Sequence, residues 1–208
     1  MKLVKTQDGS FTVFNEIANE HYHSISGALE EAFEKHVNAI GVEDGFRILD
    51  FCFGLGYNSI AATKDHGNLQ IIGLENDLEI VKIIKTLEVP EIIKTEFDAF
   101  RDLAAKLEIT DKKNNTIKLI IGDALQTIDK LPDNSFDRVF FDPFSPGKQP
   151  EMWSEEIFQQ IFEKMKTAAK LSTYSCAKWI RTNMINTGFT VLDGPKIGRK
   201  SPATIAIK

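Results

Sequence analysis

The sequence has few of the residues on which disulfide-rich, metal-binding and membrane proteins depend. Its two cysteines, Cys52 and Cys176, lie far apart and form no Cys-x-x-Cys motif, so we expect small buried side chains rather than a disulfide or a thiolate metal site. The four histidines include no pair at i and i+4, which argues against a helical metal site. No apolar run approaches the roughly eighteen residues of a membrane-spanning helix, and the amino terminus lacks the apolar core of a signal peptide. We therefore expect a cytoplasmic protein with no membrane association and no bound metal.

The residues that are present fit one enzyme-sized domain, 1–208. The chain has 208 residues, of which 42% are hydrophobic, and a chain of this length buries roughly 70% of its unfolded surface in one core. We expect residues 1–44 to form a small β entry and a helix, and residues 45–208 to form an α/β core. Gln7-Asp-Gly-Ser10 separates two short β segments, and the apolar positions from Ala28 to Ile40 keep helical spacing.

The core begins with an apolar strand that breaks into a glycine turn and a helix. In Phe46-Arg-Ile-Leu-Asp-Phe-Cys-Phe-Gly-Leu-Gly56, the glycines Gly54 and Gly56 would let the backbone approach a ligand closely. The motif is weak alone, because a close strand-to-helix turn needs glycine for steric reasons. Ser59 also replaces the third glycine of a dinucleotide site.

Two further predicted strands each end in an acidic residue. Gln70-Ile-Ile-Gly-Leu-Glu75 ends nineteen residues after Gly56, where a carboxylate accepts both hydroxyls of a ribose. Leu119-Ile-Ile-Gly-Asp123 repeats the pattern, and Asp123 could receive an exocyclic adenine amine. Each acid alone fits a helix cap or a solvated turn. If the strands are parallel, both acids lie at one edge of the sheet with the glycine turn, which predicts a nucleoside cofactor site.

A third strand, Val139-Phe-Phe141, ends in Asp142-Pro-Phe144. Pro143 withholds an N–H and so ends the ladder, which leaves backbone carbonyls near it free to face the crevice. A carboxylate, a free carbonyl and an aromatic face together could hold the hydrogens of an amine and direct its lone pair. The structural alternative is an ordinary Asp-Pro turn. We predict that Asp142 and Phe144 are catalytic.

The net charge of −5 is unevenly distributed. Residues 1–144 hold 15 Lys and Arg against 25 Asp and Glu (−10), whereas residues 145–208 hold 10 against 5 (+5). Lys164, Lys166 and Lys170 fit the carboxyl end of a helix, where cations are favoured by the helix dipole. Arg199 and Lys200, in the loop before the last strand, are better candidates for contacting RNA phosphates.

The order of strand, glycine turn, helix, acid-ended strands and final hairpin predicts a doubly wound, Rossmann-like α/β sheet with a C-terminal antiparallel hairpin. It resembles class I S-adenosylmethionine-dependent methyltransferases. One family fits more closely, the methyltransferase half of the bacterial bifunctional wobble-uridine enzyme called MnmC. The similar segments are Ile48–Asn58, Gly73–Asn76, Gly122-Asp123, Asp142–Trp153, Lys178–Arg181, Thr187–Phe189, Gly198–Lys200 and, more loosely, Tyr22–Ala28. The resemblance covers nearly the whole chain except about residues 86–116.

This resemblance implies an S-adenosylmethionine-dependent tRNA methyltransferase. It would methylate the primary amine of 5-aminomethyl-(2-thio)uridine at the wobble position, giving 5-methylaminomethyl-(2-thio)uridine. The implied cofactor residues are Asp50, Gly54, Gly56, Asn58, Glu75, Asp123 and Asp142; the implied substrate or RNA residues are Tyr22, Lys148, Trp153, Arg181, Arg199 and Lys200. It also implies a stand-alone methyltransferase without the fused oxidase domain, so separate enzymes would supply the aminomethyl precursor. Lys166-Thr-Ala-Ala-Lys170 replaces the Pro-Gly-Gly turn that the family usually carries, so this turn must be built differently.

Four alternatives remain open. Another amine-directed methyltransferase, acting on nucleic acid or protein, could use the same Asp-Pro-Phe, although Ser145 precedes the second proline here. An aminopropyltransferase shares the sheet but has a glycine-denser cofactor loop. A non-catalytic RNA-binding module and a nicotinamide dehydrogenase are the others. The sequence also leaves open whether Asp142 only orients the amine or takes a proton from it.

Overall fold

The computed structural model describes residues 1–198 and 200–208, and the predicted RNA contact at Arg199 lies outside these residues. A small antiparallel sheet comes first, made of β1 (Lys2–Lys5), β2 (Phe11–Asn15) and β3 (Glu20–His21) in that order. This confirms the hairpin predicted around Gln7–Ser10. A continuous helical segment follows, comprising α1 (Ala28–Glu31), the π-helical η1 (Ala32–Val37) and α2 (Asn38–Ile40). A π-helical turn inside an α-helix is frequent at functional sites.

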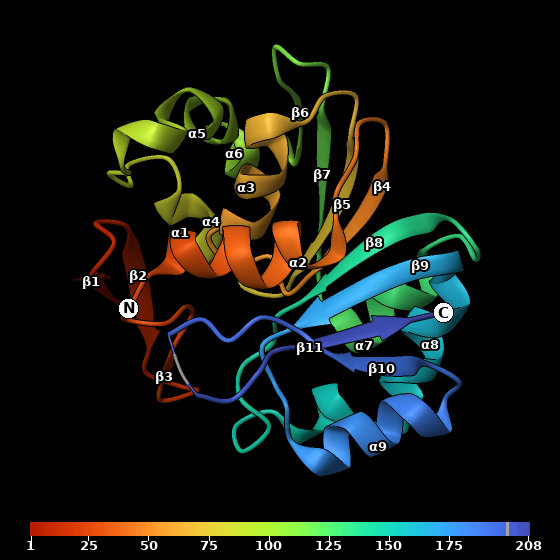
Figure 1. Ribbon diagram of the computed structural model, residues 1–208. Coiled ribbons are helices and arrows are strands. Elements are labelled where there is room, and N and C mark those ends of the chain that lie inside the picture. The colour runs from red at the N-terminus through yellow and green to blue at the C-terminus, as the bar shows by residue number, and fades with distance from the viewer. Residues whose placement is uncertain (199) are drawn as a thin grey trace.

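The main sheet has eight strands in the order β10-β11-β9-β8-β4-β5-β7-β6 (Figure 1). The parallel strands are β4 (Arg47–Phe51), β5 (Gln70–Glu75), β7 (Thr116–Ile121), β8 (Phe136–Phe141) and β9 (Met165–Thr173). The antiparallel strands are β6 (Glu108–Thr110), β10 (Thr190–Asp193) and β11 (Thr204–Ile207). The predicted doubly wound sheet with its C-terminal antiparallel hairpin is confirmed. The strand order reverses at β4, so the crevice between β4 and β8 is where such sheets bind ligands.

Helices cover both faces of this sheet (Figure 1). One face is covered by the N-terminal helical segment and five further helices: α3 (Tyr57–Asp65), α4 (Leu78–Ile83), η2 (Glu91–Ile93), α5 (Lys94–Phe100) and α6 (Leu103–Lys106). The other face is covered by α7 (Ala124–Thr127), η3 (Ile128–Lys130), η4 (Pro150–Trp153), α8 (Glu155–Lys164) and α9 (Lys178–Asn186). Successive strand residues point to opposite faces, so Phe140 packs into the first core and Phe141 into the second.

Two segments differ from the predicted elements. Residues 166–170 form no separate turn, because α8 passes directly into β9, where the register slips between the pairs Phe136–Met165 and Arg138–Lys170. Ala168 takes φ 63° in this irregular stretch, which is unusual for a residue with a side chain. The sequence also predicts one helix from Asp98 to Leu107, and this prediction is wrong, because α5 begins earlier, at Lys94, and a break separates it from α6. Among the described residues, no helix has the length and apolar character needed to cross a bilayer.

Candidate active site

The carboxyl ends of β4, β5, β7 and β8 surround a cavity of about 640 Å³. The glycine turn and the three acid-ended strands meet at this one site. The residues that they contribute to its lining are Gly54, Glu75, Asp123, Asp142 and Phe144. Parallel strands place their carboxyl ends at one edge, which is why the sequence pattern could predict this meeting. The wall on the amino-terminal side comes from the small sheet and the loop after it, including Asn15, Tyr22 and His23.

The turn after β4 is built from residues with left-handed backbone conformations. Cys52, Gly54 and Gly56 have φ of 68°, 56° and 77°. A Cβ added at Gly56 would lie 2.7 Å from Cζ of Phe53, so the turn has no room for a side chain there. Cys52 adopts this conformation without being glycine, and strained residues of this kind concentrate at functional sites. Both cysteines are free and half-buried, and Cys52 packs against the second core, so the predicted burial is partial.

Glu75 joins β5 to this turn. Its Oε2 accepts a hydrogen bond from the Gly54 N–H at 2.7 Å, and its Oε1 accepts from the N–H groups of Asn76 and Asp77, both at 2.9 Å. Burial raises the pKa of Glu75, although these backbone donors favour the ionised form. Since a carboxylate offers about four acceptor sites, Glu75 keeps capacity for a ligand hydroxyl.

Asp123 and Lys148 lie at the rim of the cavity, and Tyr22 and Phe144 form part of its wall. Asp123 also caps α7, because its Oδ1 accepts from the Leu125 N–H at 3.0 Å. The rings of Tyr22 and Phe144 meet edge to face with centroids 4.9 Å apart. Phe144 is therefore held beside Asp142 by a residue of the N-terminal region.

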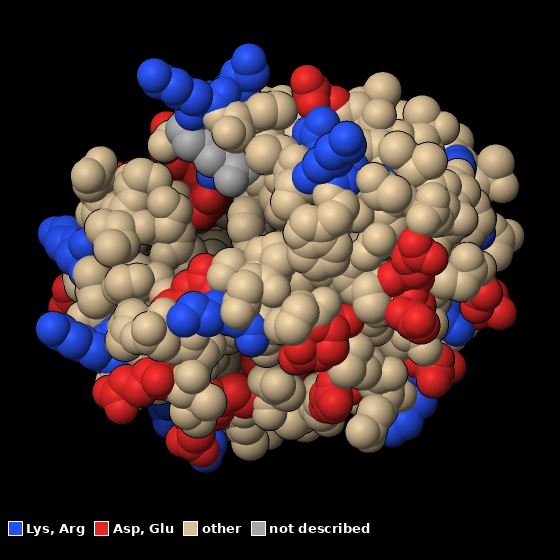
Figure 2. All heavy atoms as spheres, turned by 90° about the horizontal axis from the view of Figure 1, so that it is seen from below, with Lys and Arg blue, Asp and Glu red and all other residues tan. Residues whose placement is uncertain are grey.

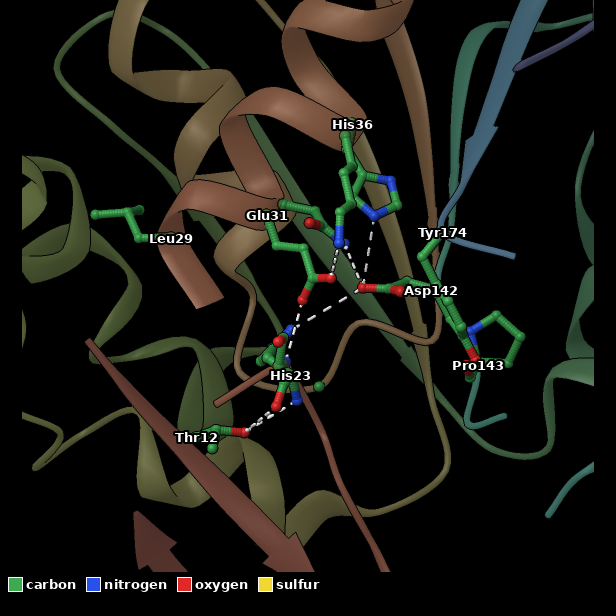
Figure 3. A network of polar contacts seen from close by, with 12 residues as sticks. Thr12, His23, Leu29, Glu31, His36, Asp142, Pro143 and Tyr174 are labelled. Carbon is green, nitrogen blue, oxygen red and sulfur yellow. Dashed lines mark hydrogen bonds and ion pairs between the residues drawn. The ribbon is translucent and has the colours of Figure 1, made fainter. Parts of the chain in front are cut away.

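Asp142 lies among polar side chains from three separate segments (Figure 3). Its Oδ2 accepts from Asn58 Nδ2 at 3.2 Å, and lies 3.7 Å from His36 Nε2 and 3.9 Å from His23 Nδ1. Burial raises the pKa of Asp142 to about 6. Burial also lowers the pKa of His23, and that of His36 to about 4, so both imidazoles are neutral near pH 7.

A smaller cavity of about 270 Å³ lies on another side of Asp142. It shares Tyr22, His23, Asp142 and Phe144 with the larger cavity and adds Glu20, Glu31 and Tyr174. Asp142 therefore stands in the wall common to both cavities.

Asp50 and Asn58, both predicted to bind the cofactor, are not part of the cavity lining and support the site from beneath. Asp50 is fully buried, and its Oδ2 accepts from the Ser59 hydroxyl at 2.6 Å. Burial raises the pKa of Asp50 to about 8, so the side chain is mostly protonated at neutral pH. Asn58 is buried in the first turn of α3 and donates to Asp142. Gly56 shapes the turn without lining the cavity.

Two of the predicted RNA contacts are structural residues. Trp153 is fully buried, and its Nε1–H donates to the Phe144 carbonyl at 3.0 Å, so it positions Phe144 and has no surface for RNA. Arg181 donates to Asp193 at 2.7 Å and to the Thr204 hydroxyl at 2.9 Å, which ties α9 to the C-terminal hairpin. Burial contradicts direct RNA contact for Trp153. The Arg181 side chain is 23% exposed, so RNA contact at this residue stays a prediction. Lys200 is exposed but does not line either cavity.

Sequence reasoning gave no role in the site to His23 and His36. His36 occupies an apolar position of the predicted helix, and a polar side chain at a core position is the signal that could have identified it. In the structure it is 1% exposed. Its partners come from segments far away in the sequence, so no local pattern reveals them.

Comparison with known proteins identifies the family. A family model described as S-adenosyl-L-methionine-dependent methyltransferase matches residues 88–208. Uncharacterized protein MJ0670 of Methanocaldococcus jannaschii is 33% identical over 214 residues, covering 99% of this chain and 59% of that protein. The tRNA 5-methylaminomethyl-2-thiouridine biosynthesis bifunctional protein MnmC of Ralstonia nicotianae is 27% identical over 217 residues, covering 94% of this chain and 33% of that protein. The crystal structure of MnmC2 from Aquifex aeolicus superposes with a TM-score of 0.83 and 29% identity, covering 99% of this chain and 69% of that one.

The chain belongs to the S-adenosyl-L-methionine-dependent methyltransferase family. The predicted enzyme class, the cofactor and the similarity to MnmC are thereby confirmed. The chain spans 59% of MJ0670 and 33% of the Ralstonia nicotianae protein. The cavity suits this cofactor. Its volume of about 640 Å³ is in the usual range for ligand sites. Among the described residues, its lining holds five carboxylates and one cation, Lys148, which favours a cationic sulfonium with an ammonium group; the carboxylates are Glu75, Asp77, Asp123, Asp142 and Glu151.

Proposed function

We propose that the protein methylates the primary amine of 5-aminomethyl-(2-thio)uridine at the wobble position of a tRNA, giving 5-methylaminomethyl-(2-thio)uridine. Relatives with 27% to 39% identity carry this biosynthesis in their names, which supports the substrate. The observation that carries the proposal is the place of Asp142 in the wall between a cavity that suits the cofactor and a second cavity. An amine in the smaller cavity would meet the methyl group beside a carboxylate.

In the larger cavity, Glu75 would accept a ribose hydroxyl and Asp123 the adenine amine, with Gly54 allowing close approach of the backbone. When bound, the cofactor supplies a methyl group on a positively charged sulfur. The protein contributes orientation of the two reactants, which is worth several kcal/mol of the barrier when both are held in line.

The smaller cavity suits a flat base that carries a cationic amine. Phe144, Tyr22 and Tyr174 offer aromatic surface, and Glu20 and Asp142 offer negative charge. A protonated amine has no lone pair, so it must lose a proton before it can attack. We assign this proton to Asp142, because a desolvated site favours a neutral amine with a neutral acid over an ion pair.

Phosphate contacts would come from the basic carboxyl-terminal third, with Lys148 at the rim of the larger cavity and Lys200 on the exposed loop. Figure 2 views the molecule from below, on the side where the parallel strands end, and shows basic side chains in separate groups among acidic ones. A tRNA substrate would place the protein in the cytoplasm, and a separate reaction would have to make the aminomethyl group.

The test is to incubate the protein with S-adenosylmethionine and tRNA that bears 5-aminomethyluridine, and to analyse the nucleosides by mass spectrometry. We expect a product heavier by one methyl group, located on the amine. Unmodified tRNA is the control substrate. Methylation of the control at the same rate, or none on either RNA, would contradict the proposal.

The Asp142 variants test the role of the carboxylate. Asp142→Ala should abolish transfer while cofactor binding, measured by thermal shift with S-adenosylhomocysteine, stays close to the wild type. Asp142→Asn can accept a hydrogen bond but takes no proton in this pH range, so we expect it to be as inactive as Asp142→Ala. Substantial activity in Asp142→Asn would show that the carboxylate only orients the amine.

A further inference from the structure

The two oxygens of the Asp142 carboxylate have different surroundings. Oδ2 receives the Asn58 amide at 3.2 Å and faces His36 Nε2 at 3.7 Å and His23 Nδ1 at 3.9 Å. Oδ1 has no hydrogen-bond partner among residues 1–198 and 200–208, and it is not among their fully buried unpaired atoms. One oxygen is thus held by the protein, and the other is free to meet a ligand.

The ring of His36 is fixed from its other side by β9. Its Nδ1 lies 3.0 Å from the Ser172 hydroxyl, and both side chains are buried. This is the one hydrogen-bond contact of the Ser172 hydroxyl within the described part of the chain. If Nδ1 carried the ring hydrogen, the buried hydroxyl hydrogen would lack an acceptor, which is costly. The arrangement that satisfies both groups has the Ser172 O–H donating to Nδ1 and the hydrogen of the neutral ring on Nε2.

That Nε2–H is buried and makes no hydrogen bond within the described residues, and Asp142 Oδ2 lies in front of it (Figure 3). The charged and titratable groups that surround the pair are Glu31 and Lys35 on the N-terminal helical segment, His23 before it, and Asp50 on β4. Glu31 and Lys35 hydrogen-bond to each other, so their charges largely offset one another. Asp50 is mostly protonated at neutral pH.

We propose that His36 is a positioning residue for methyl transfer: held as its Nε2–H tautomer by Ser172, it donates to Oδ2 of Asp142 and so leaves Oδ1 as the oxygen that takes the proton of the acceptor amine. This inference rests on the proposed function. The 3.7 Å separation closes to a hydrogen bond with a shift of less than 1 Å. Catalytic hydrogen bonds are often long without substrate and tighten in the complex.

Proton transfer to Asp142 comes before methyl transfer. An N–H bond of the ammonium breaks, its proton forms an O–H bond at Oδ1, and the nitrogen keeps the electron pair. The nitrogen then forms a bond to the methyl carbon while the carbon–sulfur bond breaks and leaves its pair on sulfur. The product is a secondary ammonium, and the proton on Asp142 returns to solvent once the product leaves. Throughout, Oδ2 accepts from Asn58 and His36, as either carboxylate or carbonyl oxygen.

Kinetics of His36 variants test this role. His36→Leu removes the donor and should lower the single-turnover rate by roughly 10- to 100-fold, the usual cost of losing a residue that orients a functional side chain. Without the donor the ionised form of Asp142 is less favoured, so the acidic limb of the pH–rate profile should move to higher pH. His36→Gln keeps an N–H donor and should restore much of the rate. Cofactor affinity should be unchanged in both variants.

Two variants on β9 provide a matched pair. Ser172→Ala removes the hydroxyl that fixes the ring and should shift the profile in the same direction as His36→Leu, by a smaller amount. The neighbouring Thr173 carries a buried hydroxyl without a hydrogen-bond partner among the described residues, so Thr173→Val should leave rate and profile unchanged. A wild-type rate and pH profile in His36→Leu would overturn the proposal, and so would equal effects of Ser172→Ala and Thr173→Val.

A second measurement does not depend on activity. Nitrogen-15 NMR of the histidine rings should show His36 as the Nε2–H tautomer in the wild type and in Thr173→Val, with this preference lost in Ser172→Ala. A carbon-13 titration of Asp142 should give a higher pKa in His36→Leu than in the wild type. If the wild type is inactive on the aminomethyl tRNA, the proposed function fails, and these spectra still decide the arrangement. A Nδ1–H ring, or an unchanged Asp142 pKa, would overturn it.

Discussion

At the scale of the residue, burial decides which carboxylates of the site are charged. Asp142 has its pKa raised to about 6 by burial, so it is mostly ionised at neutral pH and able to take a proton. Asp50 lies deeper, and burial raises its pKa to about 8. Two aspartates near one site therefore differ in charge because of their surroundings, with the shallower one facing the cavity and the deeper one supporting α3 through Ser59.

The raised pKa of Asp50 predicts that the free energy of unfolding depends on pH. Its pKa in the folded protein is raised above the ordinary 3.8 to about 8, so the folded state binds the proton more tightly than the unfolded state. The proton on Asp50 therefore stabilises the folded state fully at a pH below the pKa of Asp50 in the unfolded chain. This contribution is lost as the pH rises through the pKa of Asp50 in the folded protein. Stability should therefore fall between about pH 4 and 8, by up to about 1.4 kcal/mol per pH unit from this group.

Urea unfolding at a series of pH values checks this prediction. Asp50→Asn keeps an acceptor for Ser59 and removes the titration, so its free energy of unfolding should fall less steeply over that range. Asp65→Asn, which changes an exposed aspartate at the end of α3, is the control. Parallel pH profiles for wild type and Asp50→Asn would contradict the assignment.

At the scale of the element, the strand-to-helix turn after β4 depends on glycines whose backbone is left-handed. Gly56 has φ 77°, and the ring of Phe53 occupies the space that its Cβ would need. Gly45 has φ 78°, but no atom lies within 4 Å of the point that a Cβ would occupy there, so the two glycines have the same backbone strain and different surroundings.

Alanine variants of Gly45 and Gly56 separate the cost of backbone strain from the cost of contact with Phe53. Gly45→Ala should cost about 1 kcal/mol, the strain of a left-handed residue with a Cβ. Gly56→Ala should cost that amount and a further 1–3 kcal/mol or so for overpacking against Phe53. Urea unfolding measures both, and cofactor titration should show weaker binding only in Gly56→Ala. Equal costs would mean that Phe53 moves aside freely.

At the scale of the whole molecule, a cofactor bound in the larger cavity would contact residues that follow β4, β5, β7 and β8, so its binding should stabilise the entire fold. A ligand that binds only the native state at 100 times its Kd adds about 2.7 kcal/mol, roughly 5–10 °C in melting temperature for a chain of this size. S-adenosylmethionine and S-adenosylhomocysteine should produce such a shift, and NAD should not.

Glu75→Gln should reduce this shift, because one amide oxygen cannot serve both the backbone donors of the turn and a ribose. Glu79→Gln, on the exposed side of α4, is the control. Thermal scans with and without ligand measure the effect. A full shift in Glu75→Gln would show that the ribose lies elsewhere.

RNA binding is also a property of the whole surface. If the carboxyl-terminal third contacts phosphates, affinity should fall steeply with salt, and Lys200→Ala should reduce the logarithmic slope by about one counterion. Lys112 lies in the turn before β7, at the opposite edge of the sheet, so Lys112→Ala is a matched control. Filter binding across a salt series measures the slope of log affinity against log salt concentration. Equal slopes for the two variants would place the RNA on another surface.

The sequence by itself determined the sheet, the glycine turn and the edge at which Glu75, Asp123 and Asp142 meet. These follow from local patterns, because the period of apolar residues identifies a strand and parallel strands share one carboxyl edge. The similarity of Asp142–Trp153 to a known family supplied the cofactor.

Only the tertiary structure decided which side chains surround Asp142 and which lie buried. His36 and Ser172 are 136 positions apart in the sequence and meet across η1 and β9. Trp153, expected at the RNA surface, is buried and bonded to the Phe144 carbonyl, and Arg181 is tied to the C-terminal hairpin. Burial, and the pKa shifts that it causes, depend on packing between segments distant in the chain, so no local pattern of residues contains them.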